Sequence, residues 1–391
     1  MKLFKLTIRN ILANGLKTWL TVFVLSIAFM LIIFMQGMMQ GWDRQAIYDT
    51  IKWEIAGGQY WSAAYDPYDP FTLDSAAALI PSELQSADKK GLLEPILIAI
   101  GTIFPSGRSM SVLIKGISPG QQLLALPATL LESQPDSEVI PAIIGTGMAR
   151  QSGLKKGDEV ILRWRDANGT FEAQDIQITG IFKTFVSSVD NGQIWISIES
   201  LQKMLLKPGN ATIMIKSKNI KAEQIDGWAF KSDEELTQSL REMLQTKKVG
   251  QSIFYIIFLL LGLLAVFDTQ TLGVFRRQRE IGTFIALGMT KKEVVHLFTI
   301  EGAINAVLAI LLGAIYGIPV CLYYAINGIP MPSGSSDFGI TIPDKIYPFF
   351  SLDLIMVSIV FMIIITALVS YLPARKIARM NPADAIKGKV Q

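Results

Sequence analysis

The stretch RRQREIGTFIALGMTKKEVV, residues Arg276–Val295, decides the fold of this chain through its neighbours. It is charged and amphipathic, yet residues 252–275 before it hold one acidic residue and a second long apolar run begins at Gly302. A charged segment between two apolar segments, each long enough to cross a bilayer, is typical of a loop at a membrane surface. The fold class therefore depends on how many such apolar segments the chain contains.

Four segments have the length and composition of membrane-spanning helices, which need about 20 mostly apolar residues. Half of the 391 residues are hydrophobic and the mean hydropathy is +0.39, which is high for a soluble chain of this length. A soluble protein with four buried helices would interrupt its apolar runs with charges, whereas the runs 19–40, 252–275, 302–326 and 354–372 hold only one charged residue, Asp268. The predicted transmembrane helices are 19–40, 252–275, 299–326 and 354–372.

The first apolar segment has an alternative interpretation as a cleaved signal peptide. Its apolar stretch is longer than the hydrophobic core of a signal peptide, and no small-x-small cleavage site follows it. These features favour a retained membrane anchor. The preceding residues, 1–18, are amphipathic, with Leu3, Leu6 and Ile11 opposite the basic side chains, and they predict a helix along the cytoplasmic membrane surface.

The basic residues predict the orientation of the chain in the membrane. Lys and Arg are frequent in residues 1–18, 276–298 and 373–391, whereas the loop 327–353 holds only Lys345. The positive-inside rule therefore places both termini and the 276–298 loop in the cytoplasm, and long outer domains are largely exempt from it. The net charge of +3 reflects this topology and implies no nucleic-acid partner.

Residues 41–251, between the first two spans, are predicted to form a large extracytoplasmic α/β domain. Asn168-Gly169 lies between two strand-like runs and is a hairpin signal. Helices are predicted at 75–84, 196–206 and 232–245; the last opens with a Ser232–Glu235 capping box and is expected to continue into the second span. The predicted strands are ILIAIGTIF (96–104), SVLIKGI (111–117), EVILRW (159–164), FEAQDIQITGIF (171–182), QIWISI (193–198) and ATIMIKS (211–217).

The composition argues against catalysis by this chain. It has one histidine, His296, predicted to be solvated at a helix end, and one cysteine, Cys321, predicted to pack inside a span. A His/Cys metal cluster, a Cys–His pair or a disulfide cannot be built from these two residues. No phosphate-binding loop of the G-x-x-x-x-G-K-[ST] type occurs. We therefore expect a non-enzymatic chain without its own cofactor or metal, and any ATP to be bound by another chain.

The opening stretch predicts a helix, a tight turn and a second helix. Gly288 falls where a helix end needs a left-handed residue, and Thr290 with Glu293 predicts a capping box that starts the next helix. Arg276 and Glu280 are spaced for an i,i+4 pair. A loop that only anchors the chain at the inner surface would explain the arginines but not the two caps. A rigid element of this kind suits docking to a cytoplasmic partner.

Two of these segments resemble a known family. RRQREIGTFIALGMTKKEVVHLFTIEG is similar to the signature loop R-x-x-E-I-G-x-x-x-A-L-G-x-[TS] of the FtsX/MacB-type (type VII) ABC transporter permeases. The tail YLPARKIARMNPADAIKG resembles the P-A-R-x-A-x-x-x-x-P-x-x-A-[LI] pattern of the same family, and IIGTGMARQSGLKKGDEVILRW resembles its MacB-like extracytoplasmic core. The order of one span, a large outer domain and three spans also agrees, and the layout best resembles lipoprotein-releasing permeases.

The resemblance implies partners and site residues. It implies a second permease, identical or homologous, and a dimer of cytoplasmic ABC ATPases that binds ATP and Mg. The loop helix would dock into the ATPase, and the tail would be seated beside it. The ATPase-coupling positions are Arg276, Arg277, Arg279, Glu280, Gly282, Gly288 and Thr290, and the tail positions are Pro373, Ala374, Arg375 and Pro382.

Polar and small residues inside the spans are candidates for helix packing. Gly37 with Gly41 and Gly313 with Gly317 have the G-x-x-x-G spacing that lets helices approach closely. Asp268 stands where the family often has Asn. An intramembrane carboxylate is a functional hypothesis, and the alternative that we favour is a hydrogen bond to a neighbouring helix.

The function expected from the resemblance is mechanotransmission: ATP hydrolysis in the partner moves the outer domain, which extracts or exports a lipoprotein or another amphiphile from the membrane. One alternative is a regulatory complex that transports nothing and activates a periplasmic partner such as a cell-wall hydrolase; a periplasmic carrier is a further expected partner. Peptide or antibiotic efflux is another alternative. A membrane receptor without any ATPase leaves the loop and tail motifs unexplained.

Overall fold

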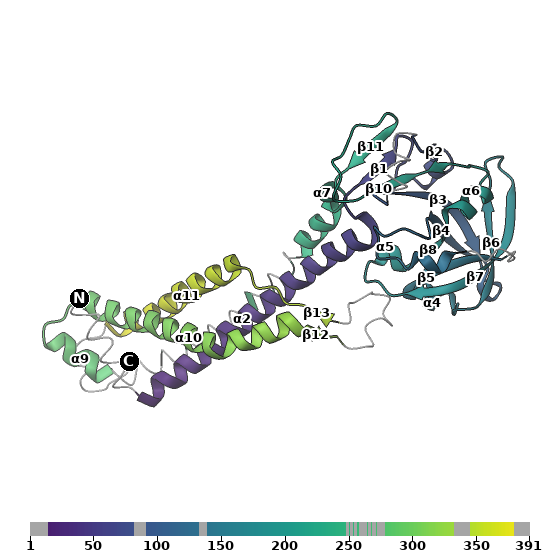
Figure 1. The fold of residues 1–391 in the computed structure, drawn as a ribbon. Coiled ribbons are helices and arrows are strands. Elements are labelled where there is room, and N and C mark those ends of the chain that lie inside the picture. Colours follow the sequence, from purple (N-terminus) through teal and green to yellow (C-terminus); the bar gives the residue numbers. More distant parts are fainter. Residues whose placement is uncertain are drawn as a thin grey trace. The chain divides into compact units, whose positions relative to one another are not determined.

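The computed structural model describes residues 15–81, 91–132, 139–247, 250, 278–331 and 345–378, with isolated helical positions between 253 and 271. The chain divides into two compact units (Figure 1). The helical unit comprises 1–44, 244–330 and 345–391, and the sheet unit comprises 45–243 and 331–344. Each is described separately.

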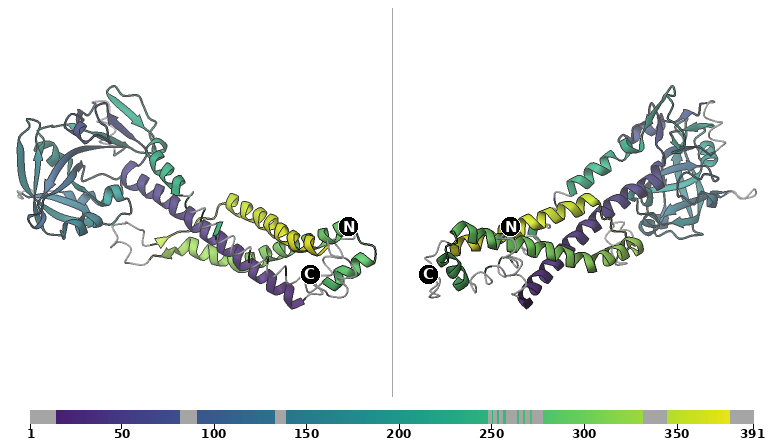
Figure 2. Two further views of the ribbon diagram at one scale, coloured as in Figure 1. Left: turned by 180° about the vertical axis from the view of Figure 1, so that it is seen from behind. Right: turned by 60° about the vertical axis from the view of Figure 1, so that its left-hand side comes forward.

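Three long helices make up most of the described part of the helical unit. They are α2 (Gly15–Thr50), α10 (Lys291–Asn327) and α11 (Leu352–Ala378), and α2 crosses α10 at an angle in both views of Figure 2. Each is long and apolar enough to cross a membrane. They contain the predicted spans 19–40, 299–326 and 354–372, whereas the predicted span 252–275 lies mostly outside the described residues.

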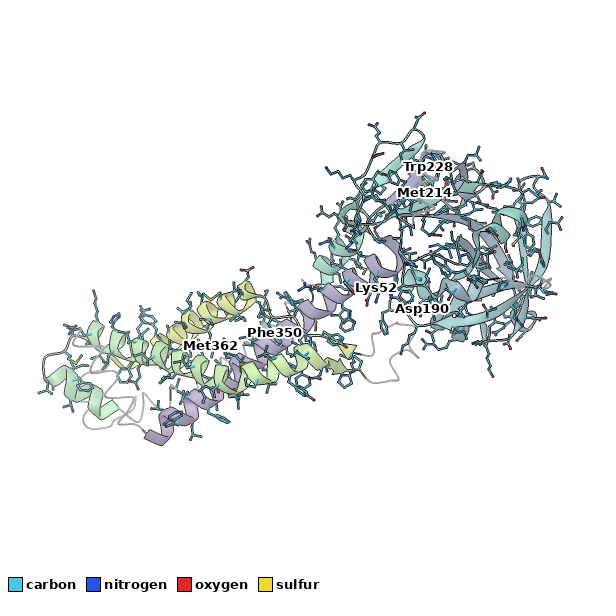
Figure 3. The ribbon with its side chains drawn as sticks, viewed as in Figure 1. Lys52, Asp190, Met214, Trp228, Phe350 and Met362 are labelled. Carbon is cyan, nitrogen blue, oxygen red and sulfur yellow. The ribbon has the colours of Figure 1, made fainter. Side chains whose placement is uncertain are left out.

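Large apolar side chains fill the centre of this helix bundle. The buried positions of α2 recur every three or four residues, as expected for one face of a helix. Phe350 and Met362, labelled in Figure 3, belong to the same cluster. Its fully buried members are Val22, Leu25, Phe29, Ile33, Ala309, Leu354 and Met362. Other large apolar side chains of these helices, such as Phe23, Leu311 and Leu368, are exposed, which suits a lipid environment.

The sheet unit is built on a nine-stranded mixed sheet in the order β11-β1-β10-β3-β4-β8-β5-β7-β6. An additional pairing of β3 with β6 closes the part from β3 to β6 into a ring. Most neighbours are antiparallel, but β4–β8 and β5–β7 are parallel. The strands are β1 (Gln59–Ser62), β3 (Leu93–Ile103), β4 (Met110–Ile117), β5 (Ile140–Gly145), β6 (Glu159–Arg165), β7 (Phe171–Phe182), β8 (Gln193–Ser197), β10 (Ile213–Lys216) and β11 (Trp228–Lys231).

Short elements connect and cover the sheet. One buried cluster lies among the ring strands and includes Leu97, Ile144 and Leu162. Met214 and Trp228, labelled in Figure 3, belong to a smaller cluster near β10 and β11. The short elements are η1 (a π-helix, Ile51–Ile55), η2 (Pro70–Asp74), β2 (Ala78–Leu79), η3 (Pro105–Gly107), η4 (Ala128–Leu131), α4 (Thr146–Ser152), α5 (Ser187–Asp190), α6 (Ile198–Met204), β9 (Asn210–Ala211) and α7 (Asp233–Leu236). Outside the sheet, β12 (Ile329–Pro330) pairs with β13 (Lys345–Ile346).

Most strand predictions are confirmed. The six predicted runs correspond to β3, β4, β6, β7, β8 and β10, and β6 and β7 form the predicted hairpin. In the turn of this hairpin, Gly169 has φ +84°. The Asp166 carboxylate accepts hydrogen bonds from the amides of Asn168 and Thr170 at 2.9 and 2.8 Å. The strands β1, β5 and β11 were not predicted. They are short, and only their neighbours in the sheet distinguish them from loops.

Two helix predictions differ from the structure. The described part of the predicted helix 75–84 contains the strand β2, which pairs with β9 more than a hundred residues later, so the helix prediction was wrong there. The predicted helix 232–245 is present but interrupted at Thr237: α7 ends at Leu236, and residues 238–247 are helical again. The Thr237 hydroxyl donates to the carbonyl of Asp233 at 2.7 Å, and its amide contacts the carbonyls of both Asp233 and Glu235, which tightens the turn. The expected continuation into the second span lies outside the described residues.

An ion pair between the buried Lys115 and the partly exposed Glu54 fixes η1 within the sheet unit. The Lys115 ammonium lies 3.8 Å from the Glu54 carboxylate and 5.1 Å from the centre of the Trp195 ring. The Ser188 hydroxyl donates to the same carboxylate at 2.8 Å. Burial lowers the pKa of Lys115, and the nearby Glu54 charge partly opposes this shift. These contacts attach η1 to β4, β8 and α5.

Candidate functional site

The turn between α9 (Gln278–Ala286) and α10 has the hydrogen bonds of a Schellman motif. The amide of Gly288 donates to the carbonyl of Ile285 at 3.0 Å, and the amide of Met289 donates to the carbonyl of Phe284 at 3.0 Å. Gly288 has φ +101°, a conformation that a residue with a side chain adopts only at a cost in free energy. The predicted glycine stop is therefore confirmed.

The helix α10 begins with the predicted capping box. The Thr290 hydroxyl accepts the amide of Glu293 at 3.3 Å, and the Glu293 carboxylate accepts the amide of Thr290 at 2.8 Å. The same carboxylate also accepts the Thr290 hydroxyl at 2.8 Å. Two of the free amides at the start of α10 are thus satisfied by side chains. Together with the Schellman motif, this box defines both ends of a turn that contains Leu287, Gly288 and Met289.

Apolar side chains pack α9 and the turn onto the start of α10 and the end of α11. Phe284 and Ile285 of α9 and Met289 of the turn lie against a buried cluster. The buried members of this cluster are Val294, Phe298 and Ala374. Ala374 is 1% exposed, so any larger side chain there would have to displace its neighbours. The structure therefore brings the A-L-G-M-T loop and the P-A-R segment, about ninety residues apart in sequence, into one packed cluster.

The predicted coupling residues differ in burial and in whether the structure describes them. Gly282 is buried on α9, whereas Gly288 and Thr290 are exposed. Arg279 and Glu280 lie on α9, but their side chains are outside the described part of the structure. Arg276, Arg277 and Pro382 lie outside the described residues altogether. Their coupling roles stay predictions.

The predicted tail residues Pro373, Ala374 and Arg375 lie within α11. Pro373 and Ala374 are buried, while Arg375 is exposed with its guanidinium 5.9 Å from the centre of the Tyr371 ring. An internal proline removes one helix hydrogen bond, yet α11 runs on to Ala378. Arg375 is thus the described tail position that presents a charge at the surface.

The predicted glycine pairs lie at close contacts. A Cβ atom on Gly37 would lie 2.2 Å from the Phe350 ring, and one on Gly41 would lie 2.0 Å from the carbonyl oxygen of Tyr347. On α10, a Cβ atom on Gly317 would lie 2.1 Å from Met30, and Gly313 has contacts of 3.3 Å or more. Gly37 and Gly41 therefore permit a close approach of residues 347–350, which precede α11 and are not helical, so these two contacts are not the predicted helix–helix packing. Gly317 faces the flexible end of the Met30 side chain of α2 and does fit a contact between two helices. Asp268 lies outside the described residues.

A further close approach between α10 and α11 was not predicted. A Cβ atom on Gly302 would lie 2.0 Å from the Ser370 hydroxyl oxygen. Buried small residues continue from Gly302 along the same face of α10, at Ala306, Ala309 and Gly313. Their spacing of three or four residues is the signal that would have revealed this contact, because small residues at that spacing mark helix interfaces in membranes.

This arrangement provides a rigid, partly charged surface and no reactive group. Among the residues that the structure describes, no cluster of three His, Cys, Asp or Glu side chains could hold a metal ion. The residues around the turn instead fix a short amphipathic helix against two long helices. Such a site can bind another protein and transmit a displacement.

Comparisons with known proteins agree with the motifs. Residues 252–382 match the family described as FtsX-like permease C-terminal. The lipoprotein-releasing system transmembrane protein LolC of Xylella fastidiosa is 22% identical over 307 residues, which cover 72% of this chain and 74% of that protein. An uncharacterized ABC transporter permease of Methanocaldococcus jannaschii is 22% identical over 274 residues, covering 65% of this chain and 64% of that protein.

A second kind of relative is longer than this chain. The macrolide export ATP-binding/permease protein MacB 2 of Aeromonas hydrophila is 30% identical over 161 residues, which cover 41% of this chain but 22% of that protein. The matched family region contains the whole turn between α9 and α10 and reaches past Arg375. The comparisons confirm the resemblance that the loop and tail motifs predicted.

Proposed function

We propose that this chain, an ABC transporter permease of the FtsX, LolC and MacB type, acts as a coupling subunit. In this proposal it couples ATP hydrolysis by separate cytoplasmic ATPase subunits to movement of its own extracytoplasmic domain. We infer that the ATPase activity lies in a separate subunit, and the match to the permease family together with the three apolar helices supports a location in a bacterial inner membrane. In this proposal a second permease completes the membrane part, and the ATPase dimer binds ATP and Mg.

The observation that carries the proposal is the packing of the turn between α9 and α10. The Schellman motif and the capping box fix the direction of α9 relative to α10, and the cluster around Ala374 holds both against the end of α11. Interactions of this kind make a short element move as one body with the helices that it contacts. A push on α9 by a partner is therefore passed to α10 and α11.

We propose a lipoprotein or another amphiphile as substrate. The support is the similarity to LolC, which covers most of both chains, whereas the similarity to MacB covers less than a third of the longer protein. Regulation of a periplasmic partner, such as a cell-wall hydrolase, is the second candidate because it uses the same coupling. Efflux of peptides or antibiotics is the third and rests on the MacB similarity.

Charge reversal at Glu280 tests the coupling. In a reconstituted complex with its ATPase and second permease, Glu280→Lys should reduce permease-stimulated ATP hydrolysis at least about tenfold, since a like charge at a docked interface costs several kcal/mol. Glu234→Lys, at an exposed position of the sheet unit, is the matched control and should leave stimulation unchanged. Equal stimulation in Glu280→Lys and the wild type would remove the docking proposal.

The substrate is tested with the same complex in liposomes. Release of a triacylated lipoprotein into the soluble fraction on addition of ATP would support extraction. ATP hydrolysis that releases no lipoprotein but switches on an added hydrolase would support the regulatory alternative instead.

A further inference from the structure

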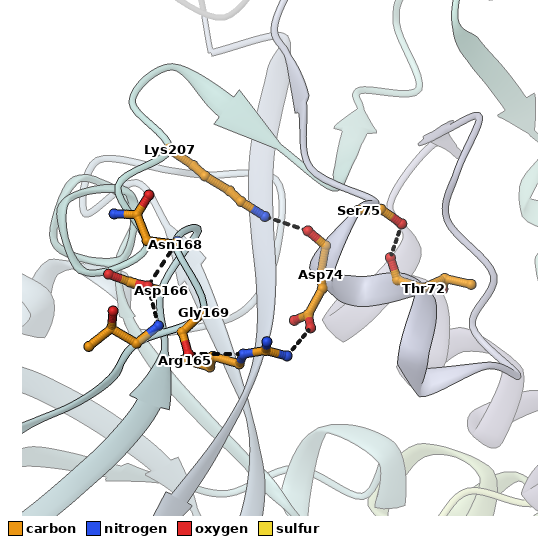
Figure 4. A network of polar contacts seen from close by, with 9 residues as sticks. Thr72, Asp74, Ser75, Arg165, Asp166, Asn168, Gly169 and Lys207 are labelled. Atoms are coloured by element: carbon orange, nitrogen blue, oxygen red, sulfur yellow. Dashed lines mark hydrogen bonds and ion pairs between the residues drawn. The ribbon is translucent and has the colours of Figure 1, made fainter.

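A pocket in the sheet unit is not used by the coupling described above. Its volume is about 230 Å³, and it lies between η2, the middle of β3, the end of β6 and the loop after α6. Figure 4 shows its polar rim, where Arg165 and Lys207 both reach toward Asp74. The pocket lies entirely within one unit.

The pocket borders a gap in the sheet. On one side of β3, β10 pairs with residues 93–96 and β6 pairs with residues 101–103. Residues 97–100 therefore have no strand partner on that side among the described strands. The amide of Ile98 donates to the Thr212 hydroxyl at 3.0 Å, and strand alternation directs the Ile98 carbonyl and the Ile100 amide toward the same side.

Unpaired strand groups of this kind can bind an extended peptide by strand addition. Here the gap is bounded by β10 at one end and by β6 at the other. A strand that ran along the full length of β3 would collide with both. The gap therefore fits the end of a chain better than an internal segment.

The two cations at the rim share one acidic partner, Asp74, whereas the carboxylate of the second lining acid, Asp166, accepts the amides of Asn168 and Thr170. The Arg165 guanidinium lies 3.5 Å from the Asp74 carboxylate, and the two side chains are 54% and 73% exposed. The Lys207 ammonium donates to the backbone carbonyl of Asp74 at 2.6 Å. Because this carbonyl carries no net charge, it does not neutralise the ammonium. An exposed ion pair is worth about 0–1 kcal/mol. A carboxylate from a ligand can therefore replace Asp74 at Arg165 and also gain the charge of Lys207.

The pocket also offers an exposed apolar side chain and a fixed rim. The Ile100 side chain is 42% exposed, and Leu73, Leu97 and Leu205 lie buried behind the largely polar lining. The loop that carries Lys207 is held by a hydrogen bond in which the Lys207 backbone amide donates to the Gln202 carbonyl at 2.9 Å. The preceding residue, Leu206, has φ +57°, and backbone strain of this kind is common at ligand-binding clamps.

We propose that this pocket binds the free C-terminus of a partner protein as a short extended segment. The α-carboxylate lies between Arg165 and Lys207, the backbone pairs with Ile98 and Ile100, and an apolar last side chain packs in the pocket. Charge-assisted hydrogen bonds to the carboxylate provide the specificity for a chain end.

Fluorescence anisotropy with the full chain in lipid nanodiscs tests this proposal. The probe is a fluorescein-labelled peptide, Gly-Ser-Gly-Ser-Val-Leu, with a free carboxylate. Its C-terminal amide should bind at least about tenfold more weakly, because the charge-assisted hydrogen bonds are lost. An amidated peptide with Asp in place of the second Ser should also bind weakly. Equal binding of the free acid and its amide would overturn the proposal, as would equal binding of the Asp peptide or no saturable binding of the free acid.

Variants link the binding to the pocket. Arg165→Gln and Lys207→Gln should each weaken binding about tenfold, whereas Arg108→Gln and Lys203→Gln, outside the pocket lining, should not change it. Asp74→Asn should strengthen binding, because it removes the carboxylate that competes for Arg165. If Asp74, Arg165 and Lys207 only stabilised the fold, Asp74→Asn would weaken peptide binding instead of strengthening it. That result would contradict the proposal.

Discussion

Two helices of this molecule, α9 and α4, are each followed by a glycine with positive φ, but the two turns have different roles. Gly288 ends α9 and Gly153 ends α4; both have positive φ, +101° and +77°, and neither would bring a Cβ atom within 4 Å of another residue. After Gly153 the chain enters the sheet core through Leu154, which is 8% exposed. Beside Gly288, the Leu287 side chain is 79% exposed. One turn therefore serves packing, and the other presents a surface.

The difference shows that a glycine stop by itself says nothing about function. Strain from a side chain at either position costs a similar free energy, because it arises from the backbone conformation and not from neighbours. Both glycines are exposed, and only their neighbours differ: Leu154, which follows Gly153, is buried in the sheet core, whereas Leu287, which precedes Gly288, is exposed. Substitutions that are identical in chemistry can therefore separate stability from coupling.

The largest expected effect is that of Gly288→Val on coupling. A β-branched residue at φ +101° costs about 1–3 kcal/mol, and α9 is expected to turn away from its docked direction to relieve this strain. Permease-stimulated ATP hydrolysis by the reconstituted complex should fall at least about tenfold. Wild-type stimulation in a variant shown to be present in the membrane would mean that the direction of α9 is unimportant.

The next effect is that of Gly153→Val on the stability of the sheet unit. The strain is again about 1–3 kcal/mol, and here it should appear as a lower free energy of unfolding, measured by urea titration with tryptophan fluorescence. Stimulation of the ATPase should persist while the unit stays folded. If Gly153→Val abolished stimulation as strongly as Gly288→Val, the two turns would not differ in function.

A smaller effect is expected for Thr290→Ala, which removes the hydroxyl of the capping box. Loss of an N-cap costs about 0.5–2 kcal/mol, so the start of α10 should fray and stimulation should fall partially. Thr290→Ser keeps the hydroxyl and is the matched control. Amide hydrogen exchange over residues 290–294 measures the fraying, and equal exchange in the Ala and Ser variants would contradict the role of the cap.

The smallest effect is expected for Gly288→Asn. Asparagine adopts the left-handed region more readily than other residues with a side chain, so the turn should be retained with stimulation close to that of the wild type. This variant separates strain from the mere presence of a side chain. If Asn were as damaging as Val, the exposed face of Gly288 itself would be required for contact with the partner.

Features set by neighbouring residues were predicted well. The stop at Gly288, the box between Thr290 and Glu293 and the hairpin at Gly169 each depend on contacts over a few residues, and the structure contains them all. The three described spans follow from length and composition alone. The residues proposed to dock an ATPase were inferred from a family motif and not from contacts between near neighbours.

Features set by distant residues were missed or predicted wrongly. The segment 75–81 has helical composition, but Ala78 and Leu79 pair with Asn210 and Ala211 of β9. Pairing with a distant strand can outweigh a weak local propensity. The pocket between Arg165 and Lys207 likewise joins residues that no local pattern relates. The spacing of small residues marks an interface at Gly302, but it does not identify Ser370 as the residue opposite.

The sequence by itself determined that this is a membrane protein with apolar helices of spanning length, a strand-rich domain before α10 and a capped helix-turn-helix. These features depend on local periodicity, hydrophobic length and hydrogen bonds between near neighbours. Only the tertiary structure decided that β3 pairs with β6 to close a ring, that Ala374 packs beside the turn and that Gly37 meets Phe350. These contacts are selected by the burial of whole surfaces, whose free energy belongs to the assembled fold and to no single segment of the chain.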